Sequence, residues 1–508
     1  MLIALPSGLI VSGVAAWAAR LVNALSARGR ACGLILHAPV PGHQGLAMRI
    51  DPRVRRFDLS SLPPLEDAAG GLEPYLPHYR AAVDSMLHAC SPVVLSPNLL
   101  GDCYGLAAAL SREFGDRLRI VGWLHNDIPY EYHVQKHYEP LISRFVPVSR
   151  RLEEGIRAAL PERAADITRI PYGVEVPASL PSRAPAAGRP LRLLYAGRMD
   201  HAQKRVLAVV AMSDALSSKG ISHELAMVGD GPAAPDVDRA IRGHSAIIRL
   251  SAKSPDQVLG LLASADIAVL ASRHEGLSIA VIEAMCRGCV PVITQTASGA
   301  AELIENGTSG VLVEVPAGEP TDAQVGEALA DGVVRASAAL PTMSAAAHAA
   351  ARDRYSINAH ADAVVRLLDS LATSPARSWP AERPCEFAGP GGGSVPPDGA
   401  AQLSRLLDSL RNRRIVLHGT GRHTLELRAV IEGHLARSGG AGIVAFTDDD
   451  PAQQGASLWG APILAPDRAA ETHCTDAVIS SWINQDAIWA RRSVYEQQGL
   501  RVHRIYEA

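Results

Sequence analysis

Short apolar runs alternate with longer segments of helical spacing along most of the chain. In the first part, apolar residues from Val14 to Leu25 recur at helical spacing, and Gly29 ends that helix. The apolar runs around it predict strands at residues 2–5, 32–37, 93–96, 118–125 and 145–149. Strands that alternate with helices in this way indicate a parallel sheet covered by helices on both faces.

A second series of the same kind begins at residue 191. Its strands are expected at residues 191–197, 224–229, 246–251, 266–272, 290–294 and 311–315. One helix start is well marked, because Ser254 and Gln257 have the spacing of a capping box and Pro255 stands at the first helical position. Residues 177–190, rich in proline and small residues, separate the two series as a linker.

A third, shorter pattern of strands and helices follows a stretch rich in proline and glycine. The whole pattern predicts an α/β protein with two doubly wound Rossmann-like domains that face each other and a small Rossmann-like domain at the end. In domain terms, we expect residues 1–176, residues 177–350, a flexible linker over residues 373–400, and a third domain over residues 401–508. Ligands of such sheets bind beyond the carboxyl ends of the strands.

Length, charge and cysteines narrow the class of protein. The chain of 508 residues is too long for one core, and its net charge of −3 gives no basic field for nucleic acid. Its seven scattered cysteines predict reduced thiols, and the isolated pair Cys286 and Cys289 is a weak zinc signal. No apolar run reaches the ~18 residues of a membrane-spanning helix, and the apolar N-terminus lacks the basic region of a signal peptide. We therefore expect a cytoplasmic protein.

Basic residues gather where the first strand of the second series gives way to a helix, which we expect from about Gln203. Lys204 and Arg205 then fall in the first helical turn, and Arg198 lies in the loop before it. Cations at a helix N-terminus oppose the helix dipole, so an anion such as a diphosphate explains their position. A solvated basic turn is the alternative.

The stretch SRHEGLSIAVIEAM, residues 272–285, places two glutamates around a predicted helix start. The free N–H groups of such a start suit a phosphate or a sugar hydroxyl. Glu275 is placed to hold sugar hydroxyls and Glu283 to hold a ribose diol, and a ligand with a sugar, a diphosphate and a ribose in line is a nucleotide sugar. The alternative is that both are ordinary acids, Glu283 solvated on the helix and Glu275 favoured by its dipole.

Several segments, in the same order, resemble one family. EGLSIAVIEAMCRGCVPVI resembles the E-x7-E signature of the family-4 retaining glycosyltransferases, and AGRMDHAQKR is similar to their basic diphosphate clamp. SGVAAWAARLVNAL resembles their glycine loop with its first helix, and GWLHNDIP their histidine-bearing strand on the acceptor side. The resemblance covers about residues 1–372 and implies the GT-B fold, with residues 351–372 forming a helix that returns to the first domain.

The resemblance implies a role for each matching residue. Lys204 and Arg198 would neutralise the leaving diphosphate, and Glu275 would contact the donor sugar. The full set of implied catalytic residues is Glu275, Lys204, Arg198 and His125. The implied substrate-binding residues are Gly13, Gly276, Leu277, Ser278, Glu283 for the ribose, and Asp127 on the acceptor side.

The resemblance also implies a retaining transfer that needs neither a cofactor nor a metal ion. The donor would be a nucleotide-diphosphate sugar, UDP- or GDP-linked, although RLSAKSPDQV lacks a glycine that many members carry near the base, which leaves the nucleotide open. The acceptor hydroxyl would belong to a glycan, a lipid-linked sugar or a small molecule, with no nucleic acid as partner. Peripheral contact with the inner face of the membrane stays open.

Three other functions compete with glycosyl transfer. A retaining glycoside hydrolase also pairs two carboxylates, but it needs no diphosphate clamp. A nucleotide-sugar epimerase on the same fold, and a protein that binds a sugar nucleotide without turnover, both keep the clamp and stay open.

The third domain carries an incomplete nucleotide-binding fingerprint. Gly419 and Gly421 follow a predicted strand, but Thr424 stands where a third glycine is usual. This resembles a Rossmann-like nucleotide-binding domain, and also the N-terminal domain of certain sugar O-acyltransferases. A nucleotide site and a structural or docking domain both stay open. The acids Asp448–Asp450 are expected to form a turn at a strand end rather than a metal-binding motif.

Overall fold

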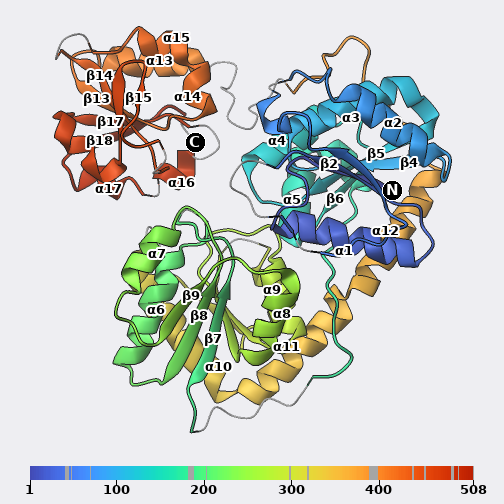
Figure 1. Ribbon diagram of the computed structural model, residues 1–508, viewed down its shortest axis with the longest axis horizontal. Coiled ribbons are helices and arrows are strands. Elements are labelled where there is room, and N and C mark those ends of the chain that lie inside the picture. Colours follow the sequence, from blue (N-terminus) through green and yellow to red (C-terminus); the bar gives the residue numbers. More distant parts are fainter. Residues whose placement is uncertain are drawn as a thin grey trace. The chain divides into compact units, whose positions relative to one another are not determined.

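The computed structural model describes residues 1–39, 45–46, 48–68, 70–180, 188–201, 203–296, 299–316, 320–387, 399–436, 440–450, 453–481, 485–489 and 491–506. The chain divides into two compact units, Met1–Phe387 and Ala388–Ala508 (Figure 1).

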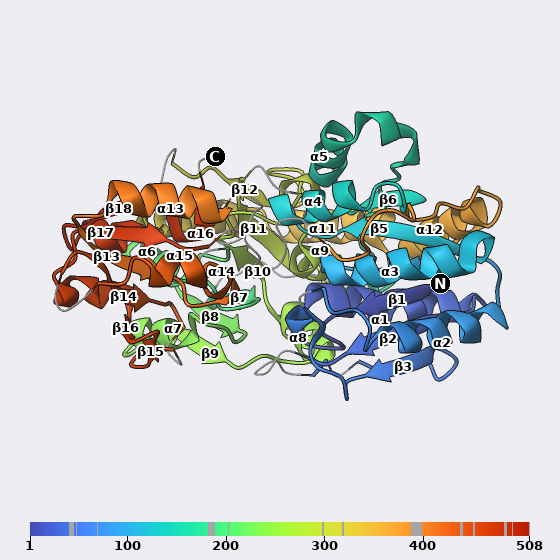
Figure 2. The ribbon, with the colours of Figure 1, turned by 90° about the horizontal axis from the view of Figure 1, so that it is seen from above.

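The first domain of the first unit contains a six-stranded parallel sheet in the order β3-β2-β1-β4-β5-β6. Its strands are β1 (Leu2–Leu5), β2 (Gly33–His37), β3 (Arg55–Leu59), β4 (Val93–Ser96), β5 (Leu118–Leu124) and β6 (Arg144–Pro147). Figure 2 shows β3 at one edge of this sheet and β6 at the other, with β2, β1 and β5 between them. The five strands expected from apolar runs are confirmed. The edge strand β3 was missed, because it exposes every second residue and pairs only with β2.

Helices connect these strands and cover the sheet. They are α1 (Gly13–Ala27), α2 (Leu76–Leu87), α3 (Gly101–Phe114), α4 (Pro129–His137) and α5 (Arg150–Ala159). The hydroxyl of Ser12 accepts a hydrogen bond from the Ala15 N–H and so fixes the start of α1. The expected end of this helix near Gly29 is confirmed, since Gly29 has a φ of 73°.

The second domain repeats the arrangement with the strand order β12-β11-β10-β7-β8-β9, again all parallel. Its strands are β7 (Leu191–Ala196), β8 (His223–Val228), β9 (Ile247–Leu250), β10 (Ile267–Leu270), β11 (Val290–Thr294) and β12 (Val311–Val313). Its helices are α6 (Val206–Ser218), α7 (Ala234–Ala240), α8 (Pro255–Ser264), α9 (Ile279–Cys286), α10 (Asp322–Ala338) and α11 (Leu340–Tyr355). The six expected strands are confirmed, and so is the capping box of Ser254 and Gln257 on α8.

Helix α12 (Ile357–Ala372) leaves the second domain and lies beside α1 of the first (Figure 1). The indole Nε1 of Trp17 on α1 donates a hydrogen bond of 3.0 Å to Nε2 of His360 on α12. The buried apolar cluster of the first domain also includes Val281, Ile282 and Met285 of α9. The two domains therefore share one apolar core region at α9 and α12.

A flexible linker was expected over residues 373–400, but the first part of this segment packs on the first domain. Residues up to Phe387 pack on the first domain, and the residues from 388 to 398 lie outside the described part. Trp379 is 2% exposed, its ring lies 5.1 Å from that of Tyr138, and its Nε1 donates to the Pro384 carbonyl. A proline-rich composition alone does not reveal such a buried tryptophan anchor.

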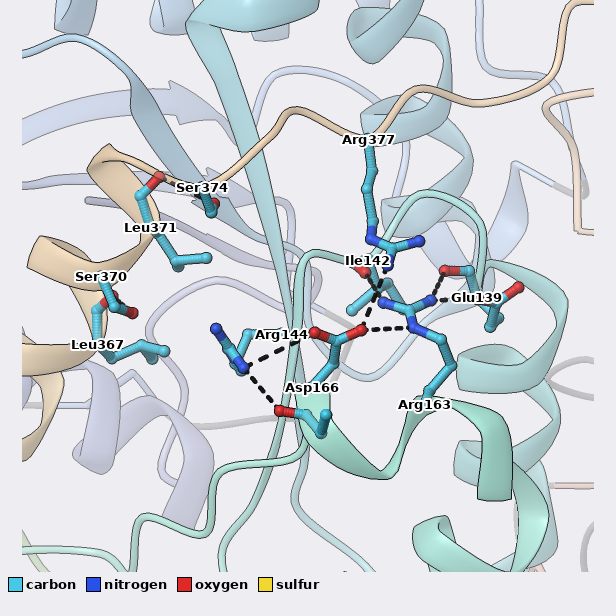
Figure 3. Close-up of polar contacts among 11 residues, drawn as sticks. Glu139, Ile142, Arg144, Arg163, Asp166, Leu367, Ser370, Leu371, Ser374 and Arg377 are labelled. Atoms are coloured by element: carbon cyan, nitrogen blue, oxygen red, sulfur yellow. Dashed lines mark hydrogen bonds and ion pairs between the residues drawn. The ribbon is translucent and has the colours of Figure 1, made fainter.

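A network of charged groups fastens the same segment (Figure 3). Asp166, at the end of a short 3-10 helix (Pro161–Asp166), accepts from Arg163 at 2.7 Å and lies 3.3 Å from Arg377. It also lies 3.8 Å from Arg144 of β6. Arg163 in turn donates to the Ile142 carbonyl at 2.6 Å and pairs with Glu139. The segment after α12 is thus tied to the first domain by polar as well as apolar contacts.

The second unit contains a mixed sheet in the order β15-β16-β14-β13-β17-β18, in which only β15 and β16 pair antiparallel. Its strands are β13 (Arg414–His418), β14 (Gly442–Thr447), β15 (Ser457–Leu458), β16 (Ala461–Leu464), β17 (Asp476–Ile479) and β18 (Arg501–Arg504). Its helices are α13 (Gly399–Ser409), α14 (Arg422–Glu426), α15 (Arg428–Glu432), α16 (Gln485–Trp489) and α17 (Ser493–Glu496). The expected small α/β domain is therefore present.

Two expectations from composition can be compared with the described residues. None of the seven cysteines, all of which lie in the described residues, forms a disulfide bond, and Cys286 and Cys289 are fully buried. In the part of the chain that the structure describes, no helix combines the length and apolar character needed to cross a bilayer.

Replacing Trp379 with alanine tests whether the segment after α12 belongs to the first domain. Loss of this buried ring should destabilise the first unit by about 3–5 kcal/mol, which denaturant unfolding of the full chain measures. The matched control is Arg383→Ala, because this exposed residue stacks on Trp379 at 5.6 Å and its loss should cost no more than about 1 kcal/mol. Equal, small effects of both changes would show that the segment adds little to the fold.

Candidate functional site

A buried ion pair lies beyond the carboxyl end of β10, in the second domain. Lys204 Nζ donates to Glu275 Oε1 over 2.5 Å, and the same oxygen accepts from the Ser272 hydroxyl at 2.7 Å. The lysine and glutamate side chains are only 16% and 10% exposed. The structure thus brings together two of the residues that the sequence singled out.

The position of Lys204 differs from the expected one. Helix α6 begins at Val206, so Lys204 and Arg205 precede it instead of forming its first turn. The reason is that Arg205 has a φ of 49°, a left-handed conformation that cannot continue a helix. The loop is further tied to its neighbour by the Arg273 N–H, which donates to the Gln203 carbonyl at 2.8 Å. This conformation lets Lys204 reach Glu275.

Arg198 lies in the loop after β7 and faces solvent. Its side chain is 58% exposed, and its guanidinium stands 3.6 Å from Asp200. An ion pair as exposed as this one contributes little to stability, and Arg198 is therefore available to bind an anion. Gly231, with a φ of 149°, makes room for this loop, since a Cβ there would lie 2.4 Å from the Met199 carbonyl oxygen and 3.0 Å from Cγ of Arg198.

The loop at Gly276 lies directly on the first domain. A Cβ on Gly276 would stand 1.9 Å from the His125 carbonyl oxygen, and a Cβ on Gly299 would stand 1.7 Å from the Gly276 oxygen. No other residue type fits either position without moving the backbone. Leu277 and Ser278 follow and are each 4% exposed. Ser278 begins α9 without a side-chain capping bond, which leaves its hydroxyl for another partner.

The ring of His125 does not reach this loop. Both of its nitrogens are engaged inside the first domain, Nδ1 with the Tyr172 hydroxyl at 2.7 Å and Nε2 with Asn98 Oδ1 at 3.0 Å. Because Asn98 Oδ1 can only accept, Nε2 carries the proton and Nδ1 accepts from Tyr172. Burial lowers the pKa of His125 to about 3, so the ring stays neutral. The ring of His125 is thus buried and hydrogen-bonded within the first domain, its carbonyl approaches Gly276, and its catalytic role stays a prediction.

Asp127 is also engaged within the first domain. Its Oδ1 accepts from the Tyr132 hydroxyl at 2.7 Å and its Oδ2 from Arg151 Nε at 2.9 Å. Each oxygen has one partner and a second lone pair that can still accept, so the predicted acceptor-side role of Asp127 stays a prediction.

Glu131, which the sequence analysis missed, shapes the loop that carries His125. Its carboxylate accepts from the N–H groups of His125 at 2.6 Å and Asn126 at 3.0 Å, and from Asn126 Nδ2 at 2.7 Å. Burial raises the pKa of Glu131 to about 7, although these hydrogen bonds act in the opposite direction. An acid in the first turn of a helix that follows a loop is the signal that could have identified it.

Glu283 and Gly13 lie where α9 meets α1. Glu283 Oε1 accepts from Arg20 Nη2 at 2.5 Å, and Arg20 Nε stands 3.3 Å from Glu175. A Cβ on Gly13 would lie 3.5 Å from Cδ1 of Ile279, so the start of α1 is packed against the start of α9. Glu283, the residue predicted to bind the ribose, is thus paired with an arginine of the other domain. That arginine sits in an apolar helix and was not singled out.

In the second unit, the residues that follow β13 and β14 form hydrogen bonds with one another. Asp448 Oδ2 accepts from the Thr420 N–H at 2.8 Å and from its hydroxyl at 2.6 Å, while Oδ1 accepts from the Asp450 N–H at 2.9 Å. The Thr424 hydroxyl donates to the Gly419 carbonyl. The three acids therefore form the expected turn at a strand end. Among all residues that the structure describes, no group of three or more His, Cys, Asp or Glu side chains is arranged to hold a metal ion.

Solved structures define the fold of the first unit. Sucrose-phosphate synthase from Thermosynechococcus elongatus superposes with a TM-score of 0.57 at 16% identity, over 73% of this chain and 99% of that one. The Anabaena protein Alr3699/HepE, solved with UDP and glucose, gives a TM-score of 0.53 at 18% identity over the same shares. Two Rossmann-like domains in this arrangement constitute the GT-B fold, and the chain adds a third, mixed α/β sheet to it.

Sequence comparisons show which proteins the second domain is similar to. Residues 190–336 match the profile described as "Glycosyl transferases group 1". Alpha-D-kanosaminyltransferase of Streptomyces kanamyceticus is 30% identical over 128 residues, which are 25% of this chain and 32% of that protein. The GDP-mannose-dependent alpha-(1-6)-phosphatidylinositol dimannoside mannosyltransferase of Mycobacterium tuberculosis is 28% identical over 145 residues, 27% of this chain and 37% of that protein. The chain thus matches about a third of the length of these relatives.

The pKa of Glu131 predicts a pH dependence of stability. Its ordinary pKa is 4.5 and its folded value is about 7, so between these values the folded state holds a proton that the unfolded state has released. The contribution of Glu131 to stability therefore falls as the pH rises through this range. Glu131→Gln cannot titrate, and its melting temperature should lose less than that of the wild type between pH 5 and pH 8. An equal change in melting temperature between pH 5 and pH 8 for the two proteins would contradict this role of Glu131.

Proposed function

We propose that this protein is a retaining glycosyltransferase that moves a sugar from a nucleotide-diphosphate sugar to an acceptor hydroxyl. The observation that carries the proposal is the buried pair of Lys204 and Glu275 beside Gly276, where the second domain meets the first. This pair lies in the part of the chain that matches the glycosyl transferases group 1.

In the proposed reaction, negative charge develops on the diphosphate as the sugar leaves. Arg198 is exposed and cationic, and the start of a helix such as α9 carries partial positive charge, so in this proposal both stabilise the charge. Before the donor binds, the ammonium group of Lys204 is paired with Glu275. When the donor binds, the ammonium group also interacts with the phosphates, and its ion pair with Glu275 becomes weaker. Glu275 then has an oxygen available for the hydroxyls of the donor sugar.

The attacking hydroxyl needs a base, and the two predicted side chains near the first domain's loop already have hydrogen-bond partners. The ring of His125 has both nitrogens engaged, and Asp127 has both oxygens engaged. This favours the leaving phosphate oxygen as the base, with attack from the face on which the diphosphate departs. Attack on that face retains the anomeric configuration.

The identities of donor and acceptor are proposed only by class. One relative is named as dependent on GDP-mannose and one structural neighbour was solved with UDP, and a UDP- or GDP-linked sugar fits the proposal equally. The acceptor is a hydroxyl of a glycan, a lipid-linked sugar or a small molecule. We propose that the transfer proceeds without a metal ion, because Arg198, Lys204 and the helix start supply the compensating charge.

A panel of UDP-, GDP-, ADP- and dTDP-sugars tests the proposal on the full chain. A bound donor should raise the melting temperature. Release of nucleoside diphosphate in the presence of an acceptor indicates transfer, an isomerised sugar nucleotide without acceptor indicates an epimerase, and a shift without turnover indicates a binding protein. If no nucleotide changes the melting temperature, the donor site is wrongly assigned.

Replacing either member of the buried pair should abolish transfer. Lys204→Met removes the cation and Glu275→Gln removes the charge that holds it, and each should lower the rate of nucleoside diphosphate release by about 100-fold or more. Lys219→Met is the matched control, because Lys219 forms its own ion pairs with Glu327 and Asp331 at the far end of α6. Turnover near that of the wild type in Lys204→Met would contradict the mechanism.

A further inference from the structure

Arg20 is a buried cation that the first domain sets against the second. Its side chain is 2% exposed, and its Nη2 donates to Glu283 Oε1 at 2.5 Å. Burial would lower the pKa of Arg20, but the attraction of Glu283 and Glu175 outweighs it and raises the pKa. The guanidinium therefore stays charged although almost no water reaches it.

The contact has a defined register between two helices. Gly13 and Arg20 lie two turns apart on one face of α1, and Ile279 and Glu283 lie one turn apart on one face of α9. Gly13 faces Ile279 and Arg20 faces Glu283, so the two helices run along each other at this point. Glu283 is consequently held from the first domain although it belongs to the second.

The pair leaves two N–H donors of Arg20 and one oxygen of Glu283 without a hydrogen bond, although Arg20 Nε stands 3.3 Å from Glu175. Arg20 Nη1 is buried and makes no hydrogen bond within the described residues. Glu283 Oε2 makes no hydrogen bond or ion pair to any described residue either, but, unlike Nη1, it is not fully buried. An unmade hydrogen bond of a buried charged group is costly, and apolar side chains in place of a buried ion pair are often as stable. Stability alone therefore does not account for this arrangement, whereas a hydroxyl group, which both donates and accepts, would satisfy it.

We propose that Arg20 determines specificity for the donor nucleotide by holding Glu283 in position to recognise the ribose hydroxyls. The inference rests on the proposed function, in which Glu283 binds the ribose of a nucleotide sugar. Arg20 fixes Oε1 and turns Oε2 toward a ribose hydroxyl, and Nη1 is the adjacent donor. A ribonucleotide is then recognised by residues of both domains, so its binding and the contact between α1 and α9 favour each other.

Calorimetric titration of the full chain with UDP and 2′-deoxy-UDP, and with GDP and 2′-deoxy-GDP, tests the inference. The wild type should prefer the ribonucleotide by about tenfold or more, because a hydrogen bond to a charged group is worth about 1.5–3 kcal/mol. Glu283→Gln and Arg20→Met should each bring this preference close to one. The double variant Arg20→Met/Glu283→Gln should lose no more than either single variant, since both act on the same contact.

Two controls separate this effect from a general loss of structure. Arg28→Met changes another arginine at the end of α1, which pairs with Asp362 on α12 at 2.9 Å, and should keep the preference for the ribonucleotide. Glu175→Gln removes the second partner of Arg20 and should also keep it. If Arg20→Met does not fold, Arg20→Lys keeps the charge without the fork of donors and should weaken the preference.

Each outcome decides between the inference and the function on which it rests. A preference that survives in the folded Arg20 variant but is lost in Glu283→Gln overturns the role of Arg20 and leaves the proposed function standing. A preference unchanged in both variants overturns the inference and the assignment of Glu283 to the ribose, while loss of transfer in Lys204→Met would still support a glycosyltransferase. If the wild type binds none of the four nucleotides, the inference fails together with the proposed function.

Discussion

Backbone lying directly on backbone is the constraint on which the candidate site depends. At Gly276 the space for a side chain is taken by the His125 carbonyl, and at Gly299 it is taken by Gly276 itself. Gly229 obeys the same restriction, since a Cβ there would stand 1.9 Å from the Gly197 oxygen. The first two approaches bring the loops after β5, β10 and β11 together, and the third brings the loop after β8 onto the loop after β7. Glu275 and the start of α9 have their positions only because the glycines permit this stacking.

The electrostatics of the site follow from this crowding. Each of the two glutamates that bracket the start of α9 is already paired with a cation, Glu275 with Lys204 from its own domain and Glu283 with Arg20 from the other. In the proposed function, the exposed Arg198 and the positive end of the helix dipole at the start of α9 would both attract an anion. Buried acids and a negatively charged ligand can thus share one small region without strong repulsion.

The sequence predicted the features that arise from local pattern and missed those that arise from packing. Continuous apolar runs located the buried strands, but β3 escaped because an edge strand is polar on alternate residues. Lys204 was identified, but its helix was expected from about Gln203 and begins at Val206, since nothing local announces a left-handed arginine at position 205. The segment after α12 reads as a linker until Trp379 is seen inside the first domain.

The candidate site shows the same division. The sequence could single out Glu275, Lys204 and Arg198, because charged residues that follow an apolar strand stand out in the local sequence pattern. The engagement of the His125 ring could not be predicted, since its partners Asn98 and Tyr172 lie far away in the chain. Arg20 left a signal that was not used, namely one arginine among apolar residues on the buried face of α1.

The packing of α12 and of residues 374–387 on the first domain bears on how the chain is made. The first domain is assembled from two stretches of sequence, and the whole second domain is encoded between them. On a ribosome that adds ~5–20 residues per second, the passage from residue 176 to residue 387 takes on the order of ten seconds or more. During that time the surface that receives His360 and Trp379 has no cover. The domain that is translated first is therefore the one that finishes folding after its neighbour has emerged.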